Sequence, residues 1–266
     1  MSVFLCLILI AEANFLTSGS PFMIDTAKVY RSAYNSQVIT AVAYAGNNYL
    51  AVWQDQRHGY QDIFGARINR QGVVLDTPGI IISACDASKR NPEVASGSTN
   101  FLVVWDQYTG TAGIYGARIS LDGVLLDSNP IPISNVPGGK FYPAVAFDGT
   151  NYFAVWADNR SGNNDIFGAR VTPDGIILDP LGLPIAKSLS SENEPYVAFG
   201  DSNYFVVWSR PRGDSADIYG ARVTCGGTVL DSNGIPISVA PASQGCVRVC
   251  SGAGMYLVTW DDKRNG

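Results

Sequence analysis

Two glutamates of this chain have the residue type and spacing to act together as an acid and a base. Glu93 stands twelve residues before Trp105, and Glu194 stands fourteen residues before Trp208. Two carboxyl groups that flank a sugar can protonate the leaving oxygen and activate a water molecule or attack the sugar directly. The chain has only four glutamates, and the sequence shows no third carboxylate in the same register.

The same two registers recur before every tryptophan of the chain. The residues twelve positions before a tryptophan are Ala41, Glu93, Ala144, Tyr196 and Arg248. The residues fourteen positions before a tryptophan are Ile39, Asn91, Tyr142, Glu194 and Cys246. Where the repeat is broken, a polar cluster could hold a ligand, so the candidates are Glu93, Glu194, Arg248, Tyr142 and Tyr196. The alternative is neutral drift, with Glu93 and Arg248 paired across a solvated channel.

A repeat of about 52 residues must position these side chains. The five tryptophans, at 53, 105, 156, 208 and 260, are separated by 52, 51, 52 and 52 residues. A fixed period of this size indicates a solenoid, a propeller or an array. Each unit holds four short apolar runs rich in Val, Ile and aromatic residues, separated by turns of the Asp-Gly type, which is typical of antiparallel hairpins. Polar alternation is weak, which favours strands that are buried on both faces.

These features predict an all-β, five-bladed propeller of four-stranded antiparallel blades within one domain, 1–266. The predicted units lie near 38–86, 87–137, 138–189 and 190–241, with a last unit 242–266 completed by 1–25. In the unit 141–186, the fourth and longest run is expected from Ile176 through Ile185. An open solenoid would need polar capping repeats, and the sequence shows none.

The closing blade is predicted from Gly19 and Pro21, which stand where Gly182 and Pro184 fall in the third unit. The N-terminus then supplies the outer two strands of the last blade. Two alternatives remain open. Residues 1–13 resemble a secretory signal, although no basic residue precedes Lys28. The chain could also be a piece of a longer propeller.

The loop after most tryptophans carries a pattern of the form Asp-x-Arg-x-Gly-x-x-Asp. Its candidate binding residues are Asp55, Arg57, Asp158, Arg160, Arg212, Asp262 and Arg264. The layout resembles the repeats of TolB-type propellers and the tandem repeats of secreted bacterial surface proteins. One interpretation is a ring of polar loops that binds a sugar, a peptide or Ca²⁺. The favoured interpretation is structural, with Asp and Arg paired inside the hairpin and Gly at positive φ. The same structural interpretation is given to the arginines of the recurring Gly-Ala-Arg segment, Arg67, Arg118, Arg170 and Arg222.

Several function classes are disfavoured by composition. A net charge of −5 and a pI near 4.8 argue against nucleic acid as a partner. No apolar run reaches the roughly 20 residues of a membrane helix. The single histidine, His58, is expected in an exposed loop, and the five cysteines form neither a zinc pattern nor an even disulfide set.

From these observations we predict a non-catalytic binding or interaction module, monomeric and extracytoplasmic or secreted. It would recognise a glycan or a protein through loops on one propeller face, without a metal or cofactor. The alternatives are a glycoside hydrolase with channel carboxylates and a scaffold within a longer surface protein.

Overall fold

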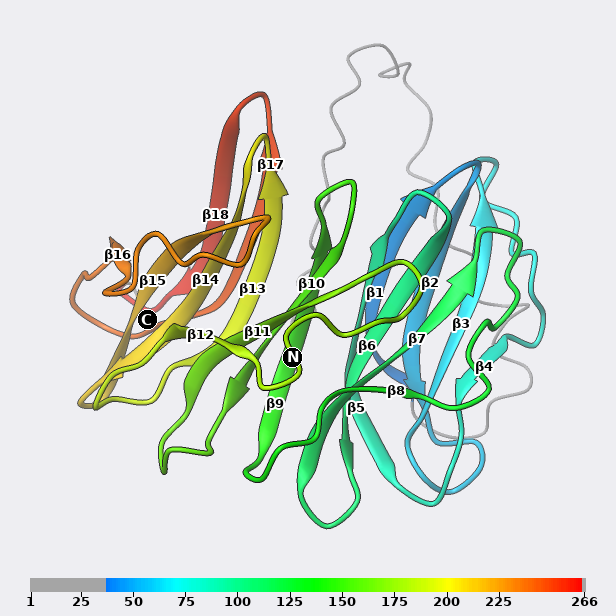
Figure 1. Ribbon diagram of the computed structural model, residues 1–266, viewed down its shortest axis with the longest axis horizontal. Helices are drawn as coiled ribbons and strands as arrows, with labels where there is room; N and C mark the ends of the chain where they lie inside the picture. Colours follow the sequence, from blue (N-terminus) through cyan, green and yellow to red (C-terminus); the bar gives the residue numbers. More distant parts are fainter. Residues whose placement is uncertain (1–36, 265–266) are drawn as a thin grey trace.

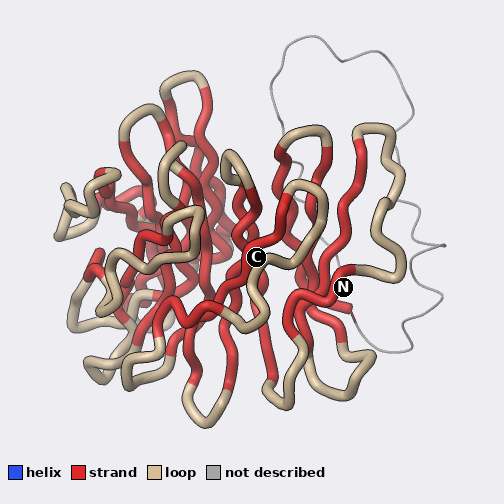
Figure 2. Tube along the Cα trace, turned by 45° about the vertical axis from the view of Figure 1, so that its right-hand side comes forward, coloured by secondary structure: helices blue, strands red, loops and turns tan. Residues whose placement is uncertain are grey.

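The computed structural model describes residues 37–264 of the chain and contains only strands, turns and loops there. Figure 2 shows strands joined by short loops throughout this part of the molecule. Four blades have four antiparallel strands each, and the fifth has two in the described residues. The chain is therefore an all-β, five-bladed propeller, as the tryptophan repeat predicts.

The strands follow one another in chain order within each blade. Blade 1 consists of β1 (Gln37–Ala45), β2 (Asn48–Asp55), β3 (Asp62–Asn69) and β4 (Ile80–Ser83). Blade 2 consists of β5 (Ser88–Ser96), β6 (Asn100–Tyr108), β7 (Ala112–Ser120) and β8 (Ile131–Ser134). Blade 3 consists of β9 (Lys140–Phe147), β10 (Tyr152–Asp158), β11 (Asp165–Val171) and β12 (Leu183–Ala186). Blade 4 consists of β13 (Asn193–Gly200), β14 (Asn203–Arg212), β15 (Ser215–Thr224) and β16 (Ile235–Ser238). Blade 5 consists of β17 (Gln244–Gly252) and β18 (Met255–Asp262).

The blades stand side by side in sequence order, from β1–β4 to β17–β18 (Figure 1). Their first strands, β1, β5, β9, β13 and β17, pack against one another in succession. One cavity of about 400 Å³ is lined by residues from all five of these strands, including Ala43, Ala95, Ala146, Ala198 and Cys250. The first strand of every blade therefore borders a central channel, and its side chains are the ones placed to meet a ligand there.

The core lies between the blades, because the second strands of blades 1 to 4 are largely buried on both faces. All seven residues of β10 are buried. Trp105, Trp156 and Trp208 are fully buried, and Trp156 packs with Phe167 and Ala169 in one such layer. Because both faces of these strands are buried, polar and apolar residues alternate only weakly in their sequence.

The fourth strand is much shorter than the sequence predicts. In blade 3 the strand covers only Leu183–Ala186, and residues 176–182 form a loop held by a single bridge between Val171 and Ile177. Asp179 explains the difference, because its carboxylate accepts hydrogen bonds from the backbone and guanidinium of Arg170 at 2.9 and 2.8 Å. This contact ties the segment back to β11 and prevents a continuous outer strand. The predicted completion of the last blade by 1–25 lies outside the described residues.

Candidate active site at the mouth of the central channel

Each described first strand carries a β-bulge at the residue fourteen positions before the tryptophan. Asn91, Tyr142, Glu194 and Cys246 have φ values of 52°, 54°, 51° and 51°. The register of β5 with β6 shifts at this point, and β9, β13 and β17 shift equivalently. A non-glycine residue in the left-handed region costs roughly 1–2 kcal/mol, and bulges turn side chains to new directions. The backbone conformation therefore distinguishes the residues fourteen positions before the tryptophans from those twelve positions before them.

Glu93 lies on β5 just after the bulge, and two other blades supply its polar neighbours. The Tyr196 hydroxyl of β13 donates a hydrogen bond to Glu93 Oε2 at 3.4 Å. Arg248 of β17 lies over the Tyr196 ring, with Cζ 4.8 Å from the centroid, and its charge acts on the Glu93 carboxyl. The structure therefore brings together Glu93, Tyr196 and Arg248, which are 52 or more residues apart in sequence.

The surroundings of Glu93 favour its neutral form. Burial raises the pKa of its carboxyl to about 7, against the opposing effects of Arg248 and of the Tyr196 hydrogen bond. The side chain still keeps part of its surface accessible. A carboxyl that is protonated near neutral pH and reachable from a channel can donate a proton to a bound ligand.

Asp106 is a second carboxyl of this region that the sequence analysis did not select. It is 1% exposed and accepts a hydrogen bond at 2.6 Å from Asn91 Nδ2 and another from the backbone N–H of Tyr142 in the next blade. Burial raises its pKa to about 6. In blade 1 the residue after the tryptophan has the same role, because Gln54 follows Trp53 and accepts the Asn91 N–H at 2.9 Å. The position directly after Trp105 is therefore the only sequence signal for Asp106.

Tyr142 occupies the bulge of blade 3, and Glu194 occupies the bulge of blade 4. Tyr142 is 44% exposed, and Glu194 is partly exposed. The charge of Glu194 acts on the thiol of Cys246, whose pKa is raised by burial, by Glu194 and by Asp261. The carboxylates of Glu194 and Asp261 therefore lie beside Cys246 at the start of blade 5.

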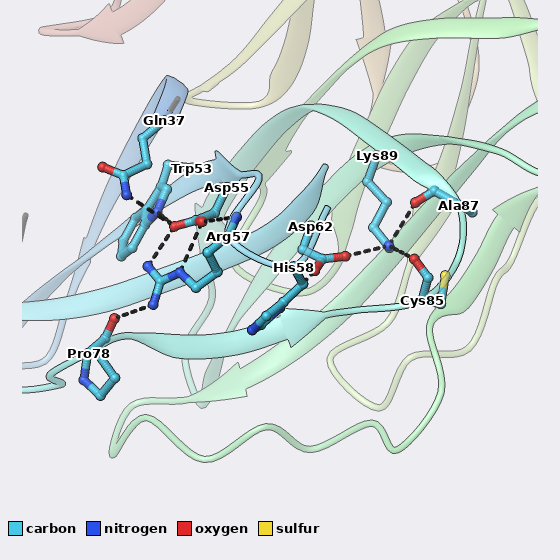
Figure 3. Close-up of polar contacts among 10 residues, drawn as sticks. All are labelled: Gln37, Trp53, Asp55, Arg57, His58, Asp62, Pro78, Cys85, Ala87 and Lys89. Atoms are coloured by element: carbon cyan, nitrogen blue, oxygen red, sulfur yellow. Dashed lines mark hydrogen bonds and ion pairs between the residues drawn. The ribbon is translucent and has the colours of Figure 1, made fainter. Parts of the chain in front are cut away.

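The predicted loop residues lie apart from this cluster and satisfy one another. Arg57 binds Asp55 through Nε at 3.0 Å and Nη2 at 2.6 Å, and Trp53 Nε1 donates to the same carboxylate at 3.1 Å. Burial opposes ionisation of Asp55, but the hydrogen bonds from Arg57 prevail, so its pKa is lowered. Arg57 also reaches the carbonyl of Pro78, which anchors the loop (Figure 3).

The loops of blades 3 and 5 repeat this arrangement, with ion pairs between Asp158 and Arg160 at 2.5 Å and between Asp262 and Arg264 at 2.8 Å. In blade 4 Arg212 pairs instead with Asp217 of β15 at 2.8 Å. Gly59 and Gly162 have φ values of 95° and 103°. These contacts agree with the structural interpretation of the loops and leave Asp55 and Asp158 fully buried rather than presented to a ligand.

The other polar residues of these loops, and the arginines of the Gly-Ala-Arg segments, also form ion pairs within the protein. His58 lies in the loop, half exposed, and its Nδ1 is 3.1 Å from Asp62 Oδ2. The fully buried Lys89 of the next blade donates to Asp62 Oδ1 at 3.0 Å (Figure 3). The arginines of the Gly-Ala-Arg segments pair with aspartates nine residues later, Asp76, Asp127, Asp179 and Asp231.

Within residues 37–264, no group of three or more His, Cys, Asp or Glu side chains is arranged to hold a metal ion. Four cysteines of this part, Cys85, Cys225, Cys246 and Cys250, are free thiols. None of the described segments is a helix long and apolar enough to cross a membrane.

Comparison with known proteins finds solved structures with a similar fold. No protein-family model matches the chain, and no curated protein matches its sequence. The endo-arabinase of Bacteroides thetaiotaomicron is similar with a TM-score of 0.54 at 13% identity, covering 85% of this chain and 89% of its own. A thermostable family-43 glycoside hydrolase has a TM-score of 0.51 at 14% identity, covering 79% of this chain and 78% of its own. An exo-1,5-α-L-arabinanase from a bovine ruminal metagenomic library has a TM-score of 0.50 at 11% identity, covering 84% and 86%.

The likeness shows a shared fold. The sequence-based prediction of a non-catalytic binding module is contradicted by it, because these solved structures are an arabinase, an arabinanase and a glycoside hydrolase. The resemblance of the loops to TolB-type repeats gains no support from the same three structures.

Proposed function

We propose that this chain is a glycoside hydrolase whose general acid is Glu93. The observation that carries the proposal is the carboxyl of Glu93, which lies on the first strand of blade 2 in contact with Tyr196 of blade 4, is partly accessible and has a pKa of about 7. Cleavage of a glycosidic bond needs a protonated carboxyl beside the leaving oxygen, and a raised pKa supplies one at neutral pH.

The neighbours of Glu93 fit this role. Arg248 and the Tyr196 hydroxyl both favour the ionised form, so they stabilise the carboxylate that remains after proton transfer. Glu194, on the bulge of β13, is the carboxylate that we assign to water activation or direct attack. Asp106 adds a third carboxyl in the wall, held by Asn91 and the Tyr142 backbone.

The fold neighbours supply the first substrates to test. Because the similar structures include an endo-arabinase and an exo-1,5-α-L-arabinanase, arabinan is the leading polymer. A polymer of this kind is met outside the cytoplasm, so we also propose an extracytoplasmic location. The resemblance to TolB-type repeats rests on the loop motif alone and suggests no different activity.

The test is hydrolysis of linear arabinan, xylan and a panel of nitrophenyl pentosides by the purified chain. We expect reducing ends or nitrophenol to be released, and Glu93→Gln to lower turnover by about 10²–10⁴-fold, the usual contribution of a general acid. Asp231→Asn is the matched control, because Asp231 pairs at 2.8 Å with Arg222 on the third strand of blade 4, and its loss should leave turnover unchanged. Absence of turnover across the panel, or a fully active Glu93→Gln variant, would overturn the proposal.

A further inference from the structure

Three aromatic side chains form a continuous surface where blade 2 meets blade 3. The ring centroids of Tyr108 and Phe141 lie 6.3 Å apart, and those of Phe141 and Tyr142 lie 6.5 Å apart. Tyr142 is 44% exposed, and the other two rings are partly exposed. Tyr108 ends β6, whereas Phe141 and Tyr142 stand near the start of β9, so this aromatic surface crosses from one blade to the next.

The other repeats carry no aromatic residue at these three positions. Three residues after the tryptophan they have Gln56, Asn159, Pro211 and Lys263. Fifteen residues before it they have Val38, Arg90, Asn193 and Gly245, and fourteen before it Ile39, Asn91, Glu194 and Cys246. Residues that serve the common scaffold recur from unit to unit. Three departures that meet at one blade junction therefore indicate a local role.

The backbone fixes the direction of these rings. Tyr142 occupies the bulge of β9 with a φ of 54°. The Phe141 ring lies against Gly139, where an added Cβ would come within 2.6 Å of Phe141 Cζ. The N–H of Gly139 donates to Asn159 Oδ1 at 2.6 Å, which holds this segment in place. Rings that are already positioned lose less conformational freedom when a ligand binds.

Arg90 adds a hydrogen-bond donor beside the aromatic surface. Its Cζ lies 5.1 Å from the centroid of the Tyr108 ring, and its Nε donates to Gln61 Oε1 at 3.2 Å. The Arg90 side chain is exposed. Apolar rings beside a few polar groups are typical of small-molecule sites. This combination suits a sugar, which presents C–H groups on its ring faces and hydroxyl groups around its rim.

The aromatic surface adjoins the candidate general acid through Asp106. Asn91, two residues before Glu93 on β5, donates to the Asp106 carboxylate at 2.6 Å. Asp106 also accepts the backbone N–H of Tyr142. Burial, and then the charge of Asp106, raise the pKa of the Tyr108 hydroxyl. Asn91 and Glu93 are roughly 7 Å apart along the strand, at about 3.3 Å per residue, so a sugar chain bound at Glu93 can extend to the rings.

We propose that Tyr108, Phe141 and Tyr142 form a sugar-binding subsite for an oligosaccharide whose scissile bond lies at Glu93. The inference rests on the proposed hydrolase function and adds the direction of the substrate, which leaves the candidate active site over blades 2 and 3. One sugar unit stacks on the exposed Tyr142 ring, and Arg90 donates to its hydroxyl groups. The substrate is therefore an oligosaccharide or polysaccharide, since one unit occupies the subsite while another is cleaved at Glu93.

The test is equilibrium binding of linear α-1,5-arabinopentaose and of xylopentaose, measured by isothermal titration calorimetry. The full chain carries Glu93→Gln, so that hydrolysis does not consume the ligand. For the sugar that binds more tightly, we expect Tyr142→Ala to weaken binding at least about ten-fold. Tyr142→Phe keeps the ring and should change binding less than about three-fold. Tyr44→Ala is the matched control, because Tyr44 also pairs with a ring, Tyr49 at 4.9 Å, and also lies under an arginine, Arg70, but at the opposite end of the blade 1 strands.

Three results of this titration would overturn the subsite. They are unchanged affinity in Tyr142→Ala, an equal loss in Tyr44→Ala, and no measurable binding of either pentasaccharide. Saturation-transfer NMR on the Glu93→Gln chain gives a readout that does not depend on how the alanine variant folds. Irradiation of the aromatic protons should transfer saturation to the sugar C–H protons, and no transfer would also overturn the subsite.

Failure of the subsite and failure of the hydrolase activity give different results. Binding that depends on Tyr142 in a chain that hydrolyses no substrate would keep the subsite and refute the activity. Hydrolysis of arabinan or xylan together with unchanged pentasaccharide binding in Tyr142→Ala would keep the activity and refute the subsite.

Discussion

The Tyr196 hydroxyl donates a hydrogen bond to the Glu93 carboxyl at 3.4 Å, and the two residues are 103 positions apart in the chain. They lie on the first strands of blades 4 and 2, which are not neighbours, so the contact spans the region bordered by all the first strands. A carboxyl placed in this way is both enclosed and reachable, which is the combination that a general acid needs.

Turnover should depend on the protonation of Glu93. Because the acid form is required and its pKa is about 7, kcat/KM is expected to fall as pH rises above about 7. The measurement is kcat/KM on an activated pentoside from pH 4 to 9. A rate that rises continuously through pH 7 to 9 would exclude Glu93 as the acid.

Tyr196→Phe should move this alkaline limb to higher pH. The Tyr196 hydrogen bond lowers the pKa of Glu93, so its removal raises that pKa and extends the acid form upward. Arg248→Gln should act in the same direction, since the Arg248 charge also lowers the pKa. Tyr44→Phe serves as the control, because the Tyr44 hydroxyl donates to Gly46 at 2.9 Å, away from the cluster. A limb that moves to lower pH in either variant would contradict the geometry.

Stability should decrease between about pH 4.5 and 7. The pKa of Glu93 is raised from 4.5 to about 7 and that of Asp106 from 3.8 to about 6, so the folded state binds more protons than the unfolded state in this window. The contribution of Glu93 is then complete below its unfolded pKa and is lost as pH rises through its folded pKa. Urea unfolding should show a loss of roughly 3–6 kcal/mol across the window. The loss should be smaller in Glu93→Gln, and an unchanged slope in that variant would show that Glu93 titrates normally.

Lys140 should be replaceable by glutamine but not by leucine. Its Nζ is fully buried and donates to the carbonyls of Val136 and Gly138 at 2.6 and 2.8 Å. At the same place in blade 5, Gln244 Nε2 donates to the carbonyls of Ala240 and Ala242 at 3.2 and 3.3 Å. Lys140→Leu leaves both carbonyls without this donor and should cost about 1–3 kcal/mol of unfolding free energy, whereas Lys140→Gln should cost less than about 1 kcal/mol. Equal losses measured by urea unfolding would contradict this assignment.

Much of the fold follows from the repeat. The regular return of tryptophan predicts the blades, and Trp156 is buried between them as expected. The pairing of Asp55 with Arg57 also follows from local spacing, because both partners lie in one turn. The length of the fourth strand does not, because Asp179 is drawn back to Arg170 by a contact that spacing alone does not reveal.

The candidate site was predictable only in part. Glu93, Tyr196 and Arg248 share one register, so the repeat places them together. The sequence does not single out Asp106, because its hydrogen-bond partners are Asn91 and the Tyr142 backbone of the next blade. The raised pKa of Glu93 likewise depends on packing between blades. The sequence offered a glycoside hydrolase only as an alternative to a binding module, and the comparison with solved structures favours that alternative.

The central claim is tested most directly by a titration of the Glu93 carboxyl itself. The chain has only four glutamates, so labelling with ¹³Cδ-glutamate gives four carboxyl signals, and Glu93→Gln identifies the one of interest. We predict that the Glu93 signal titrates with a pKa of about 7. A midpoint near 4.5, the ordinary value of the group, would show that no proton is held there at neutral pH and would contradict the assignment of Glu93 as the general acid.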